Sequence, residues 1–305
     1  MTVETAARPF LKWAGGKGRL LGQMARFLPE ALLEGRVRRY VEPFVGGGAF
    51  FFFLQARFDV QEFYLFDRSP ELVLVYRVVQ RDVEALIAGL QRVEADYLSL
   101  ENGEREQAFY AARASFNEAR SGINFAQYGP RWIARAVQLI FLNRTCYNGL
   151  FRVNSRGDFN VPCGRYERPR ICRTENLRAA ARALQGVAIE QGDFADCEKL
   201  VGEETFVYFD PPYRPISRTA AFNAYARSSF GDAEQRRLAE FYRGLDRKKG
   251  WLMLSNSDPK NVDPEDDFFE RAYEGFRMER IRAARAINSK GSRRGPVNEL
   301  LILNY

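Results

Sequence analysis

The stretch Arg39-Tyr40-Val41-Glu42-Pro43-Phe44-Val45-Gly46-Gly47-Gly48-Ala49 decides the fold. Its first four residues predict a short strand. The glycines that follow predict a tight strand-to-helix turn, whose backbone N–H groups a ligand can approach closely. As a dinucleotide fingerprint the turn is incomplete, because Phe51 stands where a third glycine is required. A tight turn that binds nothing is the alternative.

Outside this stretch, short apolar runs alternate with helical patterns, which predicts an α/β fold with a mostly parallel sheet. One clear helical pattern covers residues 232–245, where apolar residues recur at three- and four-residue steps. The alternation is lost between about Pro70 and Pro169, so we predict an insertion there. Strands are expected at residues 39–42, 62–66, 187–190, 206–209, 251–255, 276–281 and 299–304.

The composition is that of a folded protein and excludes several kinds of chemistry. The 305 residues are 46% hydrophobic and 28% charged, an ordinary globular balance. The absence of histidine excludes Ser-His-Asp and Cys-His catalysis and the usual histidine-containing metal sites. Four cysteines without a Cys-x-x-Cys pair argue against a disulfide scaffold or an all-cysteine metal site. We therefore expect no metal and a reducing, cytoplasmic setting.

The sequence gives no sign of a membrane partner. Residues 1–10 lack the basic start and apolar core of a signal peptide. The longest uncharged run, residues 43–56, is interrupted by glycines and is shorter than the roughly 18 residues of a membrane span. We expect a soluble protein.

Positive charge is concentrated in one part of the chain. The net charge is +7, and residues 131–182 hold eleven arginines against three acidic residues. Such an excess is expected of a surface that contacts nucleic-acid phosphates. Arginine-rich codon usage is the alternative, because only seven of the 46 basic residues are lysines. Turn residues between 149 and 164 predict a β-hairpin in this region, and residues 288–298 predict an exposed basic loop.

An aspartate follows the second predicted strand. Asp67 lies nineteen residues after Gly48, where an acid can accept hydrogen bonds from the ribose hydroxyls of a nucleoside cofactor. An ordinary turn or helix N-cap before Ser69 is the alternative. Turn and acid together favour a nucleoside cofactor. A phosphate loop is disfavoured, because Leu11 and Gly18 replace its required glycine and Ser or Thr.

The most informative motif is Asp210-Pro211-Pro212-Tyr213, directly after an apolar run. Each proline fixes its own φ, so the segment is rigid. The N6 amine of adenine is a poor nucleophile until acceptors hold its hydrogens. The Asp210 carboxylate and Pro211 carbonyl could be those acceptors, while Tyr213 stacks on a base rotated out of the duplex. The reaction would be direct transfer of a methyl group from a sulfonium. The alternative is that the motif is only a proline-rich turn after a core strand.

In this order, the motifs resemble the DNA adenine methyltransferase (Dam) family, which methylates adenine N6 from S-adenosylmethionine. The resemblance implies a Rossmann-like seven-stranded S-adenosylmethionine-dependent methyltransferase sheet. It also implies a catalytic core at residues 1–69 and 170–305 and a helical and β-hairpin target-recognition insertion at 70–169. The matching segments are residues 10–17, 42–53, 67, 141–166, 210–213, 228–230 and 254–258.

The resemblance also implies site residues. Those around the methyl donor or the neighbouring active site would be Trp13, Lys17, Phe44, Gly46, Gly48, Asp67, Asp193 and Phe194, the last two holding the donor's adenine. Residues 143–152 and 159–166 resemble the recognition loop and hairpin of members that methylate GATC. The resemblance implies that Tyr147 wedges into the base stack and that Asn148 lies beside the flipped base. Leu150, Arg152 and Pro162 would read the outer bases, and Lys12 would contact the first guanine. Arg165 would be a further DNA contact.

Of these contacts, Arg152 suits a guanine edge physically, since bidentate arginine is the commonest specific contact. A phosphate-contacting or solvated arginine is the alternative. We predict a site-specific adenine-N6 methyltransferase of duplex DNA, acting within GATC in a bacterial nucleoid or phage-infected cell, with a cognate restriction endonuclease as a further partner. An RNA or protein-amide methyltransferase and a catalytically silent DNA-binding protein are the alternatives. A nicotinamide-dependent dehydrogenase is disfavoured, because it lacks the third glycine and a histidine.

Overall fold

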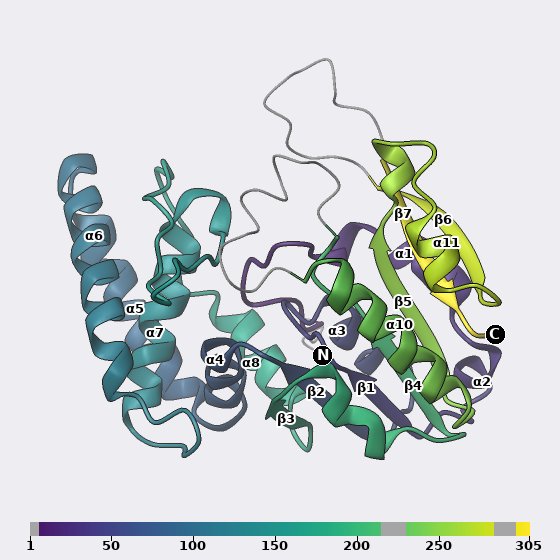
Figure 1. Ribbon diagram of the computed structural model, residues 1–305. Helices are drawn as coiled ribbons and strands as arrows, with labels where there is room; N and C mark the ends of the chain where they lie inside the picture. Colours follow the sequence, from purple (N-terminus) through teal and green to yellow (C-terminus); the bar gives the residue numbers. More distant parts are fainter. Residues whose placement is uncertain (1–5, 215–229, 284–296) are drawn as a thin grey trace. The chain divides into compact units, whose positions relative to one another are not determined.

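The computed structural model describes residues 6–214, 230–283 and 297–305 (Figure 1). The chain divides into two compact units. The first comprises Met1–Gly16, Gly46–Arg57 and Asp67–Gln191, and the second comprises Lys17–Val45, Phe58–Phe66 and Gly192–Tyr305. The predicted insertion, residues 70–169, lies within the first unit. Most of the predicted basic loop and part of the 228–230 match lie outside the described residues.

Seven strands of the described chain form one mixed sheet, in the order β3-β2-β1-β4-β5-β7-β6. β1 pairs in parallel with β2 and β4, and β4 pairs in parallel with β5. β7 is antiparallel to both β5 and β6. The predicted α/β fold with a mostly parallel sheet is confirmed. The strands are β1 (Arg39–Glu42), β2 (Glu62–Asp67), β3 (Ala188–Gln191), β4 (Thr205–Phe209), β5 (Trp251–Ser257), β6 (Arg277–Ala283) and β7 (Val297–Leu303).

The central strand β4 places the most informative motif. All five of its residues are buried, as expected for a parallel strand covered on both faces. Phe206 lies opposite Tyr40 of β1 and Trp251 of β5. Because β1, β4 and β5 are parallel, their carboxyl ends meet at one edge of the sheet. Asp210 therefore emerges at the edge where ligand sites of such sheets lie.

Helix α10 (Asp232–Asp246) covers the sheet of the second unit and confirms the predicted helical pattern. Leu238, Tyr242 and Leu245 are fully buried. The Tyr242 hydroxyl donates to the carbonyls of Leu252 and Ile302, so it fastens the helix to β5 and β7. Shorter elements of this unit are η1 (Lys17–Arg19), α1 (Leu21–Met24), η2 (Ala25–Phe27), α2 (Glu30–Leu33), η5 (Phe194–Leu200), η6 (Pro259–Asn261) and α11 (Phe268–Ala272).

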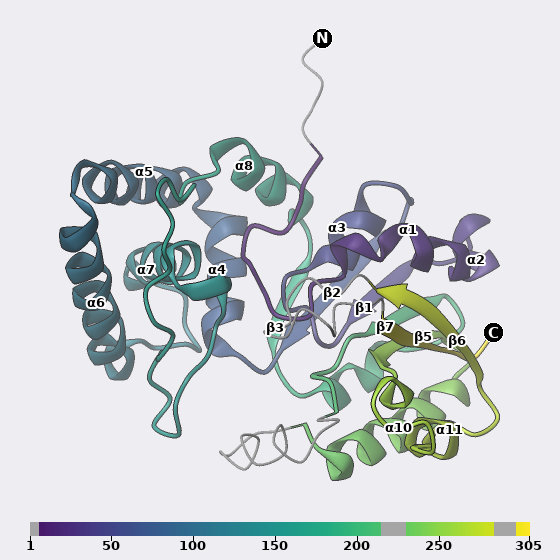
Figure 2. The same ribbon diagram turned by 90° about the horizontal axis from the view of Figure 1, so that it is seen from above.

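The first unit is mainly helical, and α7 packs against α4, α5 and α6 (Figure 2). A buried ion pair joins two of these helices: Arg135 of α7 donates through Nε to Glu71 of α4 at 3.0 Å. The helices of this unit are α3 (Ala49–Gln55), α4 (Pro70–Arg81), α5 (Val83–Ser99), α6 (Asn102–Glu118), η3 (Ala119–Gly122), α7 (Arg131–Thr145), η4 (Tyr147–Gly149) and α8 (Thr174–Ala183).

The chain after α7 folds back on itself in antiparallel fashion. Two isolated bridges pair Cys146 with Cys163 and Val153 with Phe159. The predicted hairpin pairing is thus confirmed, although it forms single bridges rather than a continuous ladder. The side chain of Asn117 in α6 accepts from the Phe159 N–H and donates to its carbonyl, which anchors the hairpin to the helices. No helix in the described part of the chain is long and apolar enough to cross a membrane.

Candidate active site

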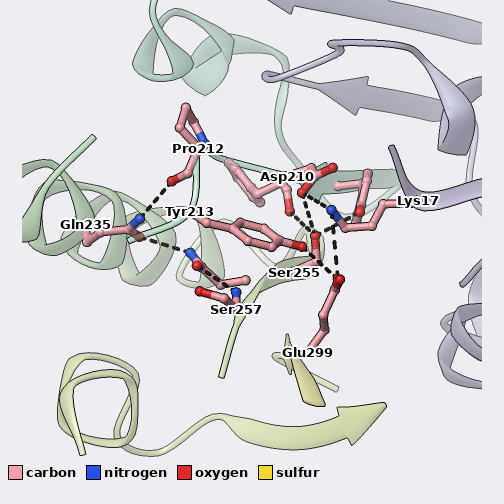
Figure 3. Close-up of polar contacts among 11 residues, drawn as sticks. Lys17, Asp210, Pro212, Tyr213, Gln235, Ser255, Ser257 and Glu299 are labelled. Atoms are coloured by element: carbon pink, nitrogen blue, oxygen red, sulfur yellow. Dashed lines mark hydrogen bonds and ion pairs between the residues drawn. The ribbon is translucent and has the colours of Figure 1, made fainter. Parts of the chain in front are cut away.

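Asp210 emerges from β4 with one carboxylate oxygen firmly held (Figure 3). Lys17 Nζ donates to Oδ1 at 2.6 Å, and Ser255 Oγ donates to the same oxygen at 3.0 Å. The Tyr208 hydroxyl lies 2.9 Å from Ser255 Oγ and completes this buried chain. Within the described residues, Oδ2 has no hydrogen-bond partner, and the side chain is 21% exposed. The protein thus holds one carboxylate oxygen, and the other keeps its lone pairs for a further donor.

The charge state of Asp210 depends on two opposing effects. Burial raises the pKa of Asp210, while the ammonium of Lys17 opposes that rise by stabilising the carboxylate. Lys17 is itself 3% exposed, so water screens this attraction little. Lys17 therefore favours the ionised form of Asp210, against the effect of burial.

The remaining motif residues are held from two other elements. The Tyr213 hydroxyl donates to Glu299 Oε2 at 2.7 Å, and Lys17 Nζ lies 4.7 Å from the centroid of the Tyr213 ring. Gln235 of α10 donates to the Pro212 carbonyl at 3.0 Å. Pro211 is buried and Pro212 exposed. The second unit therefore brings together Lys17 and the whole predicted catalytic motif.

A second group in this unit contains three of the other predicted cofactor residues, Phe44, Asp193 and Phe194. The ring of Phe44 is half-buried and lies 5.6 Å from that of Phe194, centroid to centroid. Asp193 caps η5 by accepting from the Ala195 N–H at 3.1 Å. Arg237 donates to both Asp193 oxygens, at 2.6 and 2.7 Å, and its guanidinium lies 4.1 Å from the Phe194 centroid. No sequence motif marks Arg237 as part of this group.

The glycine turn and Asp67 lie together in the first unit. The Gly46 N–H donates to Asp67 Oδ2 at 3.2 Å, and the Ser69 N–H donates to Oδ1 at 2.9 Å. Ser69 is the N-cap of α4, because its hydroxyl accepts from the Leu72 N–H. Of the two alternatives for Asp67, the N-cap is therefore wrong, whereas the bond from the Ser69 N–H is that of an ordinary turn. Burial raises the pKa of Asp67, and the backbone donors counteract this rise.

Two glycines of the turn are required by their protein neighbours. Gly46 and Gly48 have φ of 48° and 68°, in the left-handed region. A Cβ on Gly46 would lie 2.9 Å from Cδ1 of Trp13, and one on Gly48 would lie 2.5 Å from the hydroxyl oxygen of Tyr76. That hydroxyl donates to the Gly46 carbonyl at 3.1 Å. The turn thus packs against Tyr76, a residue that no sequence motif marks.

Replacing Gly48 with alanine should destabilise the protein by about 2 kcal/mol, because left-handed backbone strain adds to the clash with Tyr76. Thermal unfolding of the full chain measures this. Gly18→Ala is the control, since a Cβ there meets nothing within 4 Å. Equal unfolding temperatures for the two variants would contradict the prediction.

The predicted recognition residues surround the hairpin of the first unit. Tyr147 is 54% exposed, and the left-handed Asn148 and Gly149 follow it. The Tyr147 N–H donates to the Pro162 carbonyl at 2.9 Å. Arg152 donates through Nε to Asn160 Oδ1 at 2.8 Å. The turn therefore projects an aromatic side chain from a backbone that is held in place by a hydrogen bond.

Lys12 joins this group from the N-terminal segment. Its Nζ lies 4.5 Å from the centroid of Tyr166. The Trp13 ring stacks on Phe151 with centroids 5.4 Å apart. Leu150 is half-buried, whereas Pro162 and Arg165 are exposed. The first unit thus brings together all seven predicted DNA contacts around one loop and hairpin.

Comparisons with known proteins show the family of this chain. The family model of the D12 class N6 adenine-specific DNA methyltransferases matches residues 13–287. This chain belongs to that family. The Type II methyltransferase M.MjaIII of Methanocaldococcus jannaschii is 44% identical over 299 residues, covering 98% of this chain and 99% of the relative. The DNA adenine methylase of Escherichia coli K12 is 33% identical over 296 residues, covering 97% and 95%.

The family makes this chain an adenine-specific DNA methyltransferase and confirms the predicted resemblance. A third relative, the Type II methyltransferase M1.LlaDCHI of Lactococcus lactis subsp. cremoris, is 34% identical over 301 residues, covering 98% of this chain and 95% of the relative. A methyltransferase acts with a methyl donor, and this one acts on DNA. The described residues contain no group of three or more acidic, cysteine or histidine side chains that could hold a metal ion.

Asn143 of the methyltransferase is another residue that the sequence analysis did not single out. Its buried side chain accepts from the Lys12 N–H at 2.8 Å and donates to the Lys12 carbonyl at 2.8 Å. It also donates to the Gly149 carbonyl at 2.9 Å. One amide therefore fastens the N-terminal segment to the loop that contains Gly149.

The basic excess of the methyltransferase is partly internal. Arg135 is 1% exposed and paired with Glu71, and Arg144 is 8% exposed and donates to the Phe10 carbonyl. Burial lowers the pKa of Arg144 to about 10. Arginines 152, 156, 165, 168 and 170 are exposed. The charge count therefore identified the basic region correctly but overestimated its surface charge.

Proposed function

We propose that this methyltransferase transfers a methyl group from S-adenosylmethionine to N6 of an adenine flipped out of duplex DNA, within GATC. The observation that carries the proposal is the Asp210 carboxylate, held at Oδ1 by Lys17 and Ser255 and open at Oδ2. Its neighbour Tyr213 offers an aromatic face for the flipped base.

The proposed mechanism uses fixed acceptors. Asp210 Oδ2 and the Pro211 carbonyl accept the two N6 hydrogens, which draws the nitrogen lone pair out of the base plane. The new N–C bond forms as the C–S bond of the donor breaks, and Asp210 takes the proton that leaves N6. Lys17 keeps Asp210 ionised before the reaction, and the rigid prolines hold both acceptors in place.

The residues near the glycine turn fit S-adenosylmethionine. The Asp67 oxygens accept the N–H groups of Gly46 and Ser69, and a carboxylate has further lone pairs that suit ribose hydroxyls. The half-buried ring of Phe44 suits a planar adenine. When bound, the donor supplies an electrophilic methyl on its sulfonium. The residues we propose around it are Trp13, Lys17, Phe44, Gly46, Gly48, Asp67, Asp193 and Phe194.

For recognition, we propose that Tyr147 inserts into the base stack and Asn148 lies beside the flipped base. The exposure of Tyr147 and the sharp turn after it support this role. Lys12, Leu150, Arg152 and Pro162 would contact the outer bases, and the exposed Arg165 would contact the DNA alongside them. The core at residues 1–69 and 170–305 would act on the adenine, and the insertion at 70–169 would supply specificity.

The decisive experiment is transfer of labelled methyl from S-adenosylmethionine to duplexes that contain GATC, GAAC or no GA step, at fixed salt. We expect N6-methyladenine in the GATC duplex alone. Labelling of a different adenine site would remove the base-reading roles but keep Asp210. Absence of label in any DNA would favour an RNA or protein substrate, or a silent DNA-binding protein.

Arg152→Ala should lower kcat/KM on GATC about 10- to 100-fold and reduce discrimination against duplexes with a changed outer base pair. The reason is that, among the described residues, only its Nε has a protein partner, so its terminal nitrogens are available to a guanine edge. Arg156→Ala is the control, because Arg156 is 82% exposed near the tip of the same hairpin. A loss that is uniform across all duplexes would instead indicate a phosphate contact.

The cellular setting is proposed from the substrate. DNA methylation and four free cysteines suit the cytoplasm, at a bacterial nucleoid or in a phage-infected cell. Two relatives are named Type II methyltransferases, which supports a cognate restriction endonuclease with the same site. DNA methylated by this enzyme should resist cleavage by that endonuclease.

A further inference from the structure

Glu299, near the start of β7, contacts two residues of the catalytic group (Figure 3). Its Oε2 accepts the Tyr213 hydroxyl proton at 2.7 Å and lies 3.9 Å from Lys17 Nζ. Its side chain is only 16% exposed. The contacts therefore lie within the protein, where water competes with them little.

The backbone that carries Glu299 is fixed on both sides. β7 lies between β5 and β6, where Glu299 is opposite Ser257 and Ile281. The next four residues of the strand, Leu300 to Leu303, are fully buried. Because β7 is paired on both edges, the backbone at Glu299 is held in place. Its carboxylate can therefore serve as an anchor for the residues that it contacts.

Tyr213 needs such an anchor if it is to support a flipped base. The prolines before it fix the backbone, but the ring can still turn about its side-chain torsions. The hydrogen bond to Glu299 holds the far end of the ring, and the Lys17 ammonium lies 4.7 Å from its centroid. A stacking surface is useful only when its plane matches that of the base.

We propose that Glu299 is a positioning residue that sets the plane of Tyr213 and, through Lys17, links that ring to the Asp210 carboxylate. This inference rests on the proposed function, because the base that Tyr213 supports is the flipped adenine. Lys17 lies 2.6 Å from Asp210 and 3.9 Å from Glu299, so one cation serves both acids. Glu299 touches no reacting atom and acts through its two neighbours.

The test is a double-mutant cycle in the full chain with Glu299→Leu, Tyr213→Phe and the double variant. Single-turnover methyl transfer to a GATC duplex is measured. The fluorescence of 2-aminopurine at the target adenine is measured as well, because it reports stacking of the flipped base. We expect each single variant to lose about tenfold in transfer rate with altered fluorescence, and the double variant to lose no more than either alone.

Glu299→Gln separates positioning from a general loss of structure. Glutamine can still accept the Tyr213 hydrogen bond, so we expect fluorescence close to that of the unmodified enzyme. Glu279→Gln, at a partly exposed acid of the adjacent strand β6, is the matched control and should change neither readout. Thermal unfolding of each variant verifies that it is folded.

Two results would overturn the inference while keeping the proposed function. The first is a transfer rate in the double variant that falls by the product of the two single losses. The second is an unchanged transfer rate and unchanged fluorescence in Glu299→Leu. Failure of the proposed function looks different: the unmodified enzyme would then label no adenine in any DNA, and the positioning role would fall with it.

Discussion

Replacing Asp210 with asparagine should lower the rate of methyl transfer by roughly a hundred- to a thousandfold while donor binding stays nearly unchanged. Asparagine offers one acceptor oxygen in place of two. If that oxygen accepts from Lys17 at the Oδ1 position, the amide NH2 lies at the Oδ2 position and can only donate, so no acceptor remains there for an N6 hydrogen. Single-turnover transfer to a GATC duplex measures the rate, and calorimetry with S-adenosylmethionine measures donor binding.

Asp59→Asn is the matched control for Asp210→Asn. Asp59 is an exposed carboxylate outside the catalytic group, so its loss should leave the transfer rate unchanged. Near-normal transfer by Asp210→Asn would show that this carboxylate does not activate the amine. A large loss of donor affinity in the same variant would instead assign Asp210 to donor binding.

Replacing Lys17 with methionine should shift the acidic limb of the kcat profile to higher pH and lower transfer at neutral pH by about tenfold or more. Burial already raises the pKa of Asp210, and Lys17 opposes that rise. Without the ammonium the pKa rises further, so the carboxyl stays protonated to a higher pH and loses acceptor capacity. Transfer should recover as the pH increases. Steady-state kcat between about pH 5.5 and 9 measures the shift.

This experiment also separates two roles for Lys17. The resemblance implied a place around the donor or the neighbouring active site, whereas its ion pair with Asp210 suggests control of the acceptor. If the kcat profile of Lys17→Met has the same pH dependence as that of the unmodified enzyme, and donor binding is weaker, Lys17 contacts the donor. That result would contradict the predicted shift of the acidic limb. Lys249→Met, which removes a surface lysine paired with Glu203, should change neither quantity.

The sequence motifs predicted the residues that we propose as DNA contacts, but not the residues that support them. Tyr147, Arg152 and Pro162 belong to a loop with recognisable motifs, and they do gather at one hairpin. Asn143 lies in the same stretch, but its importance comes from Lys12, which is 131 residues away in sequence. A buried asparagine has no periodicity that marks its partner, so only the fold identifies it.

The sequence by itself determined the strands, the helix at residues 232–245 and the rigid Asp210–Tyr213 motif. These are local properties, because the alternation of apolar residues and the fixed φ of proline act over a few residues. The order of strands is not local. β7 comes last in the chain but lies between β5 and β6, which brings Glu299 to Tyr213 across 86 residues.

The same reason explains the environment of Asp210. Lys17 reaches it from 193 residues away and Ser255 from 45, each placed by packing and strand pairing that no short motif encodes. The sequence therefore named the acceptor and the aromatic ring that we propose. The tertiary structure decided the electrostatic surroundings of Asp210 and the orientation of the ring, because both depend on neighbours that only the folded chain brings within hydrogen-bonding distance.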